Sequence, residues 1–144
     1  MRAVGWLVLV ATLGGCNTDD PHVIYEPGDT TDAGDTTPPV IEHDPVETTQ
    51  AYGQPVPLSS TVTDADSSVF IVQAYYRQET SSIWKSTTLS DGNADGVYEG
   101  QIPAGDVMTG GMYYYLYAMD TEENEGYLPL GGESDPFHFR ISPD

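Results

Sequence analysis

The chain of 144 residues has few basic residues and almost no cysteine. It contains four Lys and Arg against 23 Asp and Glu, which gives a formal net charge of −19. Nucleic-acid binding depends on clustered Lys and Arg that contact phosphates, so this composition excludes a nucleic-acid-binding protein. The single cysteine, Cys16, has no partner for a disulfide within the chain and cannot form a set of thiolate metal ligands.

The common catalytic motifs are also lacking. No Gly-x-Ser-x-Gly, His-Glu-x-x-His or phosphate-binding loop occurs in the sequence. The three histidines are His22, His43 and His138. The strands that carry His43 and His138 can be neighbours, but we interpret both as isolated surface residues. We therefore expect that the protein is not an enzyme.

Long apolar runs are absent except for a short one at the N-terminus. Arg2 precedes an apolar run at residues 3–12, which is shorter than the ~20 residues that span a membrane. A charged start, a short apolar middle and small residues behind it are typical of a secretory signal. The run ends in Leu13-Gly14-Gly15-Cys16, which resembles the lipobox of bacterial lipoproteins. The alternative is an ordinary secretory signal that contains a cysteine.

The lipobox resemblance implies a signal peptide at residues 1–15 and a lipid on the thiol of Cys16. The acyl chains would anchor the protein to a membrane of the cell envelope. Many diderm lipoproteins that stay in the inner membrane carry Asp directly after the cysteine, whereas this chain carries Asn17. The outer membrane is therefore favoured.

The composition changes sharply at Pro38-Pro39. Residues 17–37 are rich in Asp, Thr, Gly and Pro, with one apolar island at Val23–Tyr25. Such a segment buries too little apolar surface to offset the entropy of ordering. We expect an acidic flexible tether at 16–38 and a single domain at 39–144. The alternative for the island is an additional edge strand.

Apolar and polar residues alternate with period two throughout the domain, and no stretch has a helical stripe. Clusters of Gly, Asp, Asn and Pro separate the alternating runs. This pattern predicts an all-β fold, a single seven-stranded antiparallel sandwich. The expected strands span 40–41, 56–62, 70–77, 83–89, 97–102, 114–118 and 137–141.

The domain resembles the immunoglobulin-like and fibronectin type III-like modules of bacterial surface proteins. No cysteine pair links the two sheets, and Trp84 falls one strand too late for the buried tryptophan of antibody-type domains. The resemblance implies a structural or adhesive role and no catalytic residues. The segments that carry it are Pro38–Ile41, Val72–Arg77, Val97–Pro103 and Tyr114–Asp120.

Strand alternation places three acidic loops at the same end of the predicted sandwich. Gathered like charges repel, so either the loops spread apart or a cation lies among them. The loops contain Asp64 and Asp66, Asp91 to Asp95, and Asp120 to Glu125.

The middle acidic loop carries a candidate calcium motif. Asp91, Asn93 and Asp95 stand at every second position and Gly96 follows, as in the first half of an EF-hand loop. The match fails at the twelfth position, where Ile102 stands in place of a bidentate Glu. The same residues are typical of a tight hairpin turn. Two hypotheses stay open: a turn alone, or a calcium site completed by Glu99 or a neighbouring acidic loop.

Alternation also predicts which face of the sheet each strand residue occupies. We expect Phe70, Val72, Ala74, Tyr76 and Trp84 to point into the core, so that the alternate residues of four strands face solvent on one sheet. These alternate residues are Ile71, Gln73, Tyr75, Arg77, Ile83, Lys85, Tyr113, Tyr115, Tyr117, His138 and Arg140.

Surfaces rich in Tyr and Arg suit recognition. The candidate binding face for an envelope protein or a glycan therefore comprises Tyr75, Arg77, Tyr113, Tyr115, Tyr117 and Arg140. The alternative is that cross-strand aromatic pairs only stabilise an exposed sheet. The expected function is that of a lipid-anchored envelope protein with a structural or adhesive domain. A calcium-assisted module that recognises a glycan or a protein is the alternative.

Overall fold

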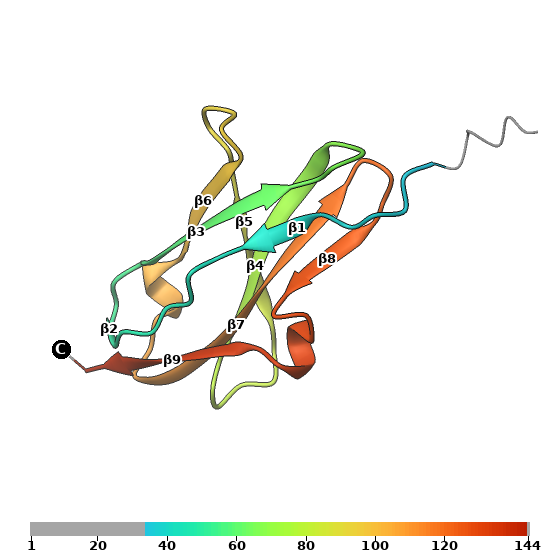
Figure 1. Ribbon diagram of the computed structural model, residues 1–144. Helices are drawn as coiled ribbons and strands as arrows, with labels where there is room; N and C mark the ends of the chain where they lie inside the picture. Colours follow the sequence, from blue (N-terminus) through green and yellow to red (C-terminus); the bar gives the residue numbers. More distant parts are fainter. Residues whose placement is uncertain (1–33, 144) are drawn as a thin grey trace, which may run out of the picture. The chain divides into compact units, whose positions relative to one another are not determined.

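The computed structural model describes residues 34–143, which form two β-sheets packed face to face (Figure 1). The smaller, three-stranded sheet is antiparallel and has the order β1-β3-β6. Its strands are β1 (Val40–Glu42), β3 (Val56–Thr63) and β6 (Val97–Ile102). The predicted signal peptide, Cys16 and the predicted tether up to residue 33 lie outside the described residues.

The larger, six-stranded sheet has the order β2-β9-β7-β4-β5, and β8 also pairs with β7. The predicted all-β sandwich is confirmed, and the strands expected at 70–77, 83–89, 114–118 and 137–141 do share one sheet. The elements are β2 (Gln50–Ala51), β4 (Val69–Gln78), β5 (Lys85–Leu89), the 3₁₀-helix η3 (Ala104–Asp106), β7 (Gly110–Asp120), β8 (Glu125–Leu128), the 3₁₀-helix η4 (Gly132–Ser134) and β9 (Phe137–Ser142).

Residues 34–143 thus contain nine strands, two more than the sequence predicted. β2 has two residues and pairs in parallel with β9, so the larger sheet is mixed rather than antiparallel. β8 follows a tight turn and pairs with the second half of β7. Both strands are short, and β8 begins at Glu125, the last acidic residue of the segment that we interpreted as a loop, so neither strand has a clear period-two pattern.

The core lies between the two sheets and consists of the alternate strand residues. Val72, Ala74 and Tyr76 of β4 are buried, as are Tyr114 and Leu116 of β7. A strand with one face on a core must bury every second side chain. The predicted phase, that is, which residues of a strand point into the core, is confirmed for most strands. Further core residues are Ile41, Val56, Leu58, Val62, Leu89, Ile102, Met112, Ala118, Phe139 and Ile141.

The predicted phase is wrong at the start of β4. Phe70 was expected to point into the core, but it is 65% exposed. The register between β4 and β7 shifts between Val69 and Ile71. A bulge adds one residue to one strand, so the residues before it exchange faces.

The predicted phase is also wrong at Trp84 and Lys85. Trp84 precedes β5 and packs on the outer face of the larger sheet, against Tyr115. Lys85 pairs in the register with the inward-facing Tyr76, and its ammonium contacts Asp106. Lys85 therefore does not belong to the outer face. Among residues 34–143, no helix is long and apolar enough to cross a membrane.

Candidate functional site

Aromatic side chains cover much of the outer face of the larger sheet. We define the aromatic face as Tyr75, Arg77, Trp84, Tyr113, Tyr115, Tyr117 and Tyr127. At its centre Tyr75 stacks on Tyr115, with ring centroids 5.1 Å apart and planes 8° from parallel. The ring of Trp84 packs edge-on against Tyr115 at 5.0 Å. Both geometries are favourable for aromatic pairs and contribute about 0.5–1.5 kcal/mol each beyond burial.

Arg77 places a positive charge within this face. Its guanidinium carbon lies 4.9 Å from the ring centroid of Trp84 and 4.7 Å from that of Tyr113. The same group donates a hydrogen bond of 2.6 Å to the backbone carbonyl of Ser81. Two cation–π contacts and a backbone acceptor thus hold the guanidinium in one orientation.

β8 adds Tyr127, which borders the face on the side of the β7–β8 hairpin. Its ring lies 5.4 Å from that of Tyr117. Glu125 accepts hydrogen bonds from both hydroxyls, at 2.9 Å from Tyr117 and 3.0 Å from Tyr127. Burial, and then the hydrogen bond to Glu125, raise the pKa of Tyr117, so this phenol stays neutral.

The structure brings together five of the six residues predicted for the binding face, all except Arg140. Arg140 is exposed on the same side of the sheet, opposite Gly111 in the register. Two residues of the face were not predicted: Trp84, because it was expected to point into the core, and Tyr127, because β8 was not expected. β8 has only four residues, too few for a clear period-two pattern, so the sequence offered no signal for Tyr127.

The face is accessible at its edges rather than at its centre. Tyr115 is only 8% exposed, whereas Tyr127 is 37% exposed. Beside Trp84 lies a hollow of about 410 Å³ that is also lined by Arg77, Glu79 and Glu133. The arrangement places an indole ring, an oriented cation and two carboxylates around one hollow.

The loop between β5 and β6 is held by its own hydrogen bonds. Asp91 Oδ1 accepts from the backbone N–H groups of Asn93, Ala94 and Asp95, and Asp91 Oδ2 accepts from that of Gly96 at 2.8 Å. These bonds, led by the one from Gly96, lower the pKa of Asp91. Because its oxygens already have donors, the geometry favours the turn hypothesis.

Of the remaining predicted calcium ligands, Asn93 and Asp95 bond within the loop, and Glu99 is not grouped with the loop carboxylates. Asp95 Oδ1 accepts from the backbone N–H of Val97 and its Oδ2 from the side chain of Asn93. Glu99 is exposed on β6 and lines a separate shallow hollow of about 800 Å³. Among residues 34–143, the acidic groups close enough to share a metal ion are a different set, Asp35, Asp64 and Asp120.

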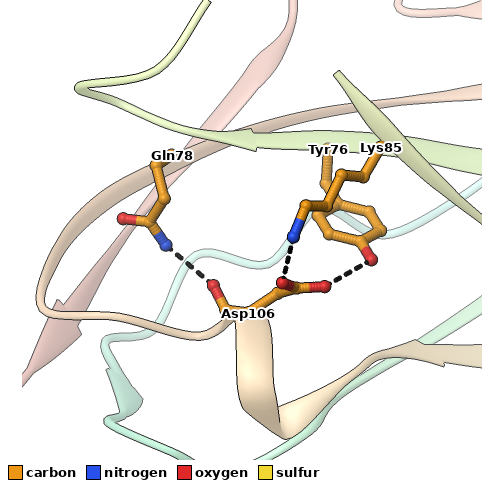
Figure 2. Close-up of polar contacts among 4 residues, drawn as sticks. All are labelled: Tyr76, Gln78, Lys85 and Asp106. Atoms are coloured by element: carbon orange, nitrogen blue, oxygen red, sulfur yellow. Dashed lines mark hydrogen bonds and ion pairs between the residues drawn. The ribbon is translucent and has the colours of Figure 1, made fainter. Parts of the chain in front are cut away.

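Asp106 in η3 is the centre of a small polar network below the edge of the larger sheet (Figure 2). Its carboxylate accepts a hydrogen bond of 2.9 Å from the Tyr76 hydroxyl and forms an ion pair with Lys85. The backbone carbonyl of Asp106 accepts from the Gln78 side chain at 2.8 Å. The hydrogen bond from Lys85 lowers the pKa of Asp106. The network attaches η3 to β4 and β5, which is a structural role.

The two histidines of the domain lie on opposite sides of the larger sheet. His43 contacts the inward-facing Tyr114, and His138 packs against the outward-facing Tyr113. His138 Nε2 lies 3.9 Å from a carboxylate oxygen of Glu79. The two imidazoles therefore do not form a joint site, and His43 is half-buried rather than a free surface residue.

Comparison of the chain with protein-family models and with curated proteins finds no match.

Proposed function

We propose that this chain is a lipid-anchored protein of the bacterial cell envelope whose immunoglobulin-like domain is adhesive, with the aromatic face as its binding surface. The observation that carries the adhesive role is the gathering of six aromatic rings and Arg77 on one side of the larger sheet. Aromatic residues and Arg are enriched where proteins recognise partners, and they contribute most of the binding free energy there.

The arrangement of Arg77 supports recognition in addition to stability. The protein is strongly acidic, with four Lys and Arg against 23 Asp and Glu, yet it holds one of its few cations on this face. Ser81, Trp84 and Tyr113 already orient the Arg77 side chain. Arg77 would therefore lose little side-chain entropy when a partner binds to it. The hollow beside Trp84 adds the carboxylates of Glu79 and Glu133 as acceptors for hydroxyl or amide donors.

The envelope location is supported by the N-terminal sequence alone. Leu13-Gly14-Gly15-Cys16 follows a short apolar run, as in lipoproteins. One acyl chain binds a membrane only marginally, whereas two or more anchor a protein stably. Asn17 after the cysteine favours the outer membrane.

The experiment compares the binding of purified variants to isolated cell envelopes of the producing bacterium. Trp84→Ala and Tyr127→Ala remove rings at the accessible edges of the face, and each should weaken binding about tenfold, which corresponds to ~1.4 kcal/mol. Tyr52→Ala is the matched control, because Tyr52 is 48% exposed and follows β2, outside the face. Protease and periodate treatment of the envelopes distinguish a protein partner from a glycan.

Tyr115 is unsuitable for this test, although the sequence places it at the centre of the face. It is 8% exposed and contacts Tyr75, Trp84 and Tyr127. Tyr115→Ala would therefore lower the stability of the domain whatever its effect on binding. Equal binding of Trp84→Ala, Tyr127→Ala and the wild type would contradict the adhesive role.

A further inference from the structure

Three aspartates from distant parts of the chain meet at one end of the sandwich. Asp35 precedes β1, Asp64 follows β3, and Asp120 is the last residue of β7. Figure 1 shows the segment before β1 beside the β3–β4 and β7–β8 turns. One carboxylate oxygen of each aspartate lies within 4.8 Å of those of the other two.

One oxygen of each carboxylate is used to hold its own turn. Asp35 Oδ1 accepts a hydrogen bond of 2.7 Å from the backbone N–H of Thr37. Asp64 Oδ1 accepts one of 2.7 Å from that of Ser67. Asp120 Oδ1 accepts bonds of 2.8 Å from the backbone N–H groups of Glu122 and Asn124. These bonds fix the direction of the three side chains.

The other oxygens lack such donors. Asp35 Oδ2 and Asp64 Oδ2 are both buried and have no hydrogen-bond partner. Asp120 is 1% exposed, and its Oδ2 accepts a single bond, of 2.7 Å, from the side-chain amide of Asn124. Burial of an unpaired carboxylate oxygen is unfavourable, so a cation placed among these atoms would stabilise them.

The described side chains do not supply that positive charge. The ion pairs among residues 34–143 join Lys85 to Asp106 and His138 to Glu79, and neither involves the three aspartates. Three ionised carboxylates at the separation of Asp35, Asp64 and Asp120 repel one another.

We propose that Asp35, Asp64 and Asp120 bind a Ca²⁺ ion that joins the segment before β1 to the β3–β4 and β7–β8 turns. All three metal ligands would be carboxylate oxygens, which suit a hard cation. Zinc is a poorer fit, because its usual ligands include imidazole and thiolate. Ca²⁺ accepts six to eight oxygens in variable geometry, so waters can complete a shell built from three separate loops. Mg²⁺ requires near-ideal octahedral geometry and fits such a site less well.

The test uses the full chain, freed of metal with a chelator, and measures calcium binding by calorimetry and the melting temperature in calcium or magnesium. We expect one Ca²⁺ per chain and a rise in melting temperature of several degrees at about ten times Kd. Magnesium should produce only the smaller rise that results from screening of the acidic surface.

Asp64→Asn is the decisive variant. It keeps Oδ1 as the acceptor for the Ser67 N–H and replaces the unpaired Oδ2 with an amide. It should lose the calcium-specific rise, and in chelator it should melt no lower than the wild type because one repulsive charge is gone. Asp95→Asn is the matched control, since it removes one charge from another acidic loop and should keep the calcium-specific rise.

Asp35→Asn is a second variant that serves if Asp64→Asn fails to fold. The Asp35 side chain accepts only the backbone N–H of Thr37, and its backbone carbonyl, which accepts from Asn124, is unchanged in the variant, so the replacement should disturb the fold little. Equal effects of calcium and magnesium on the wild type would overturn the proposal. So would retention of the calcium-specific rise in the folded Asp64→Asn or Asp35→Asn variant.

Discussion

The hydroxyl of Tyr114 lies 2.9 Å from Nε2 of His43 and also accepts a 2.9 Å hydrogen bond from the backbone N–H of Val46. His43 Nδ1 lies 2.7 Å from the carbonyl oxygen of Ser59, which can only accept. Nδ1 therefore carries the proton, and Nε2 accepts from the Tyr114 hydroxyl. Through this network β7 of the larger sheet holds the segment after β1 and contacts β3 of the smaller one.

Tyr114→Phe should lower the free energy of unfolding by about 1–3 kcal/mol. The change removes one hydroxyl and leaves the N–H of Val46 and Nε2 of His43 without their partner in a half-buried site. Urea denaturation measures the effect. Tyr52→Phe is the control, because Tyr52 is 48% exposed, and it should change the free energy by less than about 0.5 kcal/mol. Equal stability of the two variants would contradict the structural role of the network.

The domain should lose stability as the pH rises from about 10 to 12. Burial raises the pKa of both Tyr76 and Tyr114 to about 12, from the usual 10. In this range the folded state keeps phenol protons that the unfolded state has released. Stability therefore falls with pH by up to about 1.4 kcal/mol per unit for each group. Melting temperatures from pH 9 to 12 measure the slope, and Tyr114→Phe should make it shallower. An unchanged slope in that variant would contradict the assignment.

Asp91→Ala separates the two hypotheses for the loop between β5 and β6. If the loop is a turn alone, the variant should melt several degrees lower with and without calcium, because four backbone N–H groups lose their acceptor. If Asp91, Asn93, Asp95 and Glu99 bind calcium, Asp91→Ala and Asp95→Ala should both remove the stabilisation by calcium. We expect the first result, measured by thermal denaturation.

Cys16→Ser should abolish lipid attachment. Cys16 lies outside the described residues, and the prediction depends on its position after Leu13-Gly14-Gly15. Cells grown with radiolabelled palmitate should label the wild-type chain and not the variant. The variant should also leave the membrane fraction, because it lacks the acyl chains that hold the protein there. Equal labelling of both chains, or of neither, would show that residues 1–16 are not a lipoprotein signal.

Most of the fold could be predicted because its pattern is local. A strand with one face on a core must alternate, so Val72, Ala74 and Tyr76 could be assigned to the core from their spacing. The same rule failed at Phe70 and Trp84. A bulge inverts the faces at Phe70, and Trp84 precedes the first paired residue of β5. Both depend on how one strand pairs with the next, which spacing within a strand does not reveal.

The sequence alone determined the excess of negative charge, the lipobox-like segment and the tyrosines that alternate at 113, 115 and 117. Only the tertiary structure decided which carboxylate oxygens accept hydrogen bonds and which stay unpaired. Asp91 lies in the most metal-like motif, yet its oxygens accept from its own turn. Asp35, Asp64 and Asp120 share no motif, yet folding brings them together and leaves two buried oxygens unpaired. Burial and hydrogen-bond pairing are properties of segments that meet in space, so residue order does not specify them.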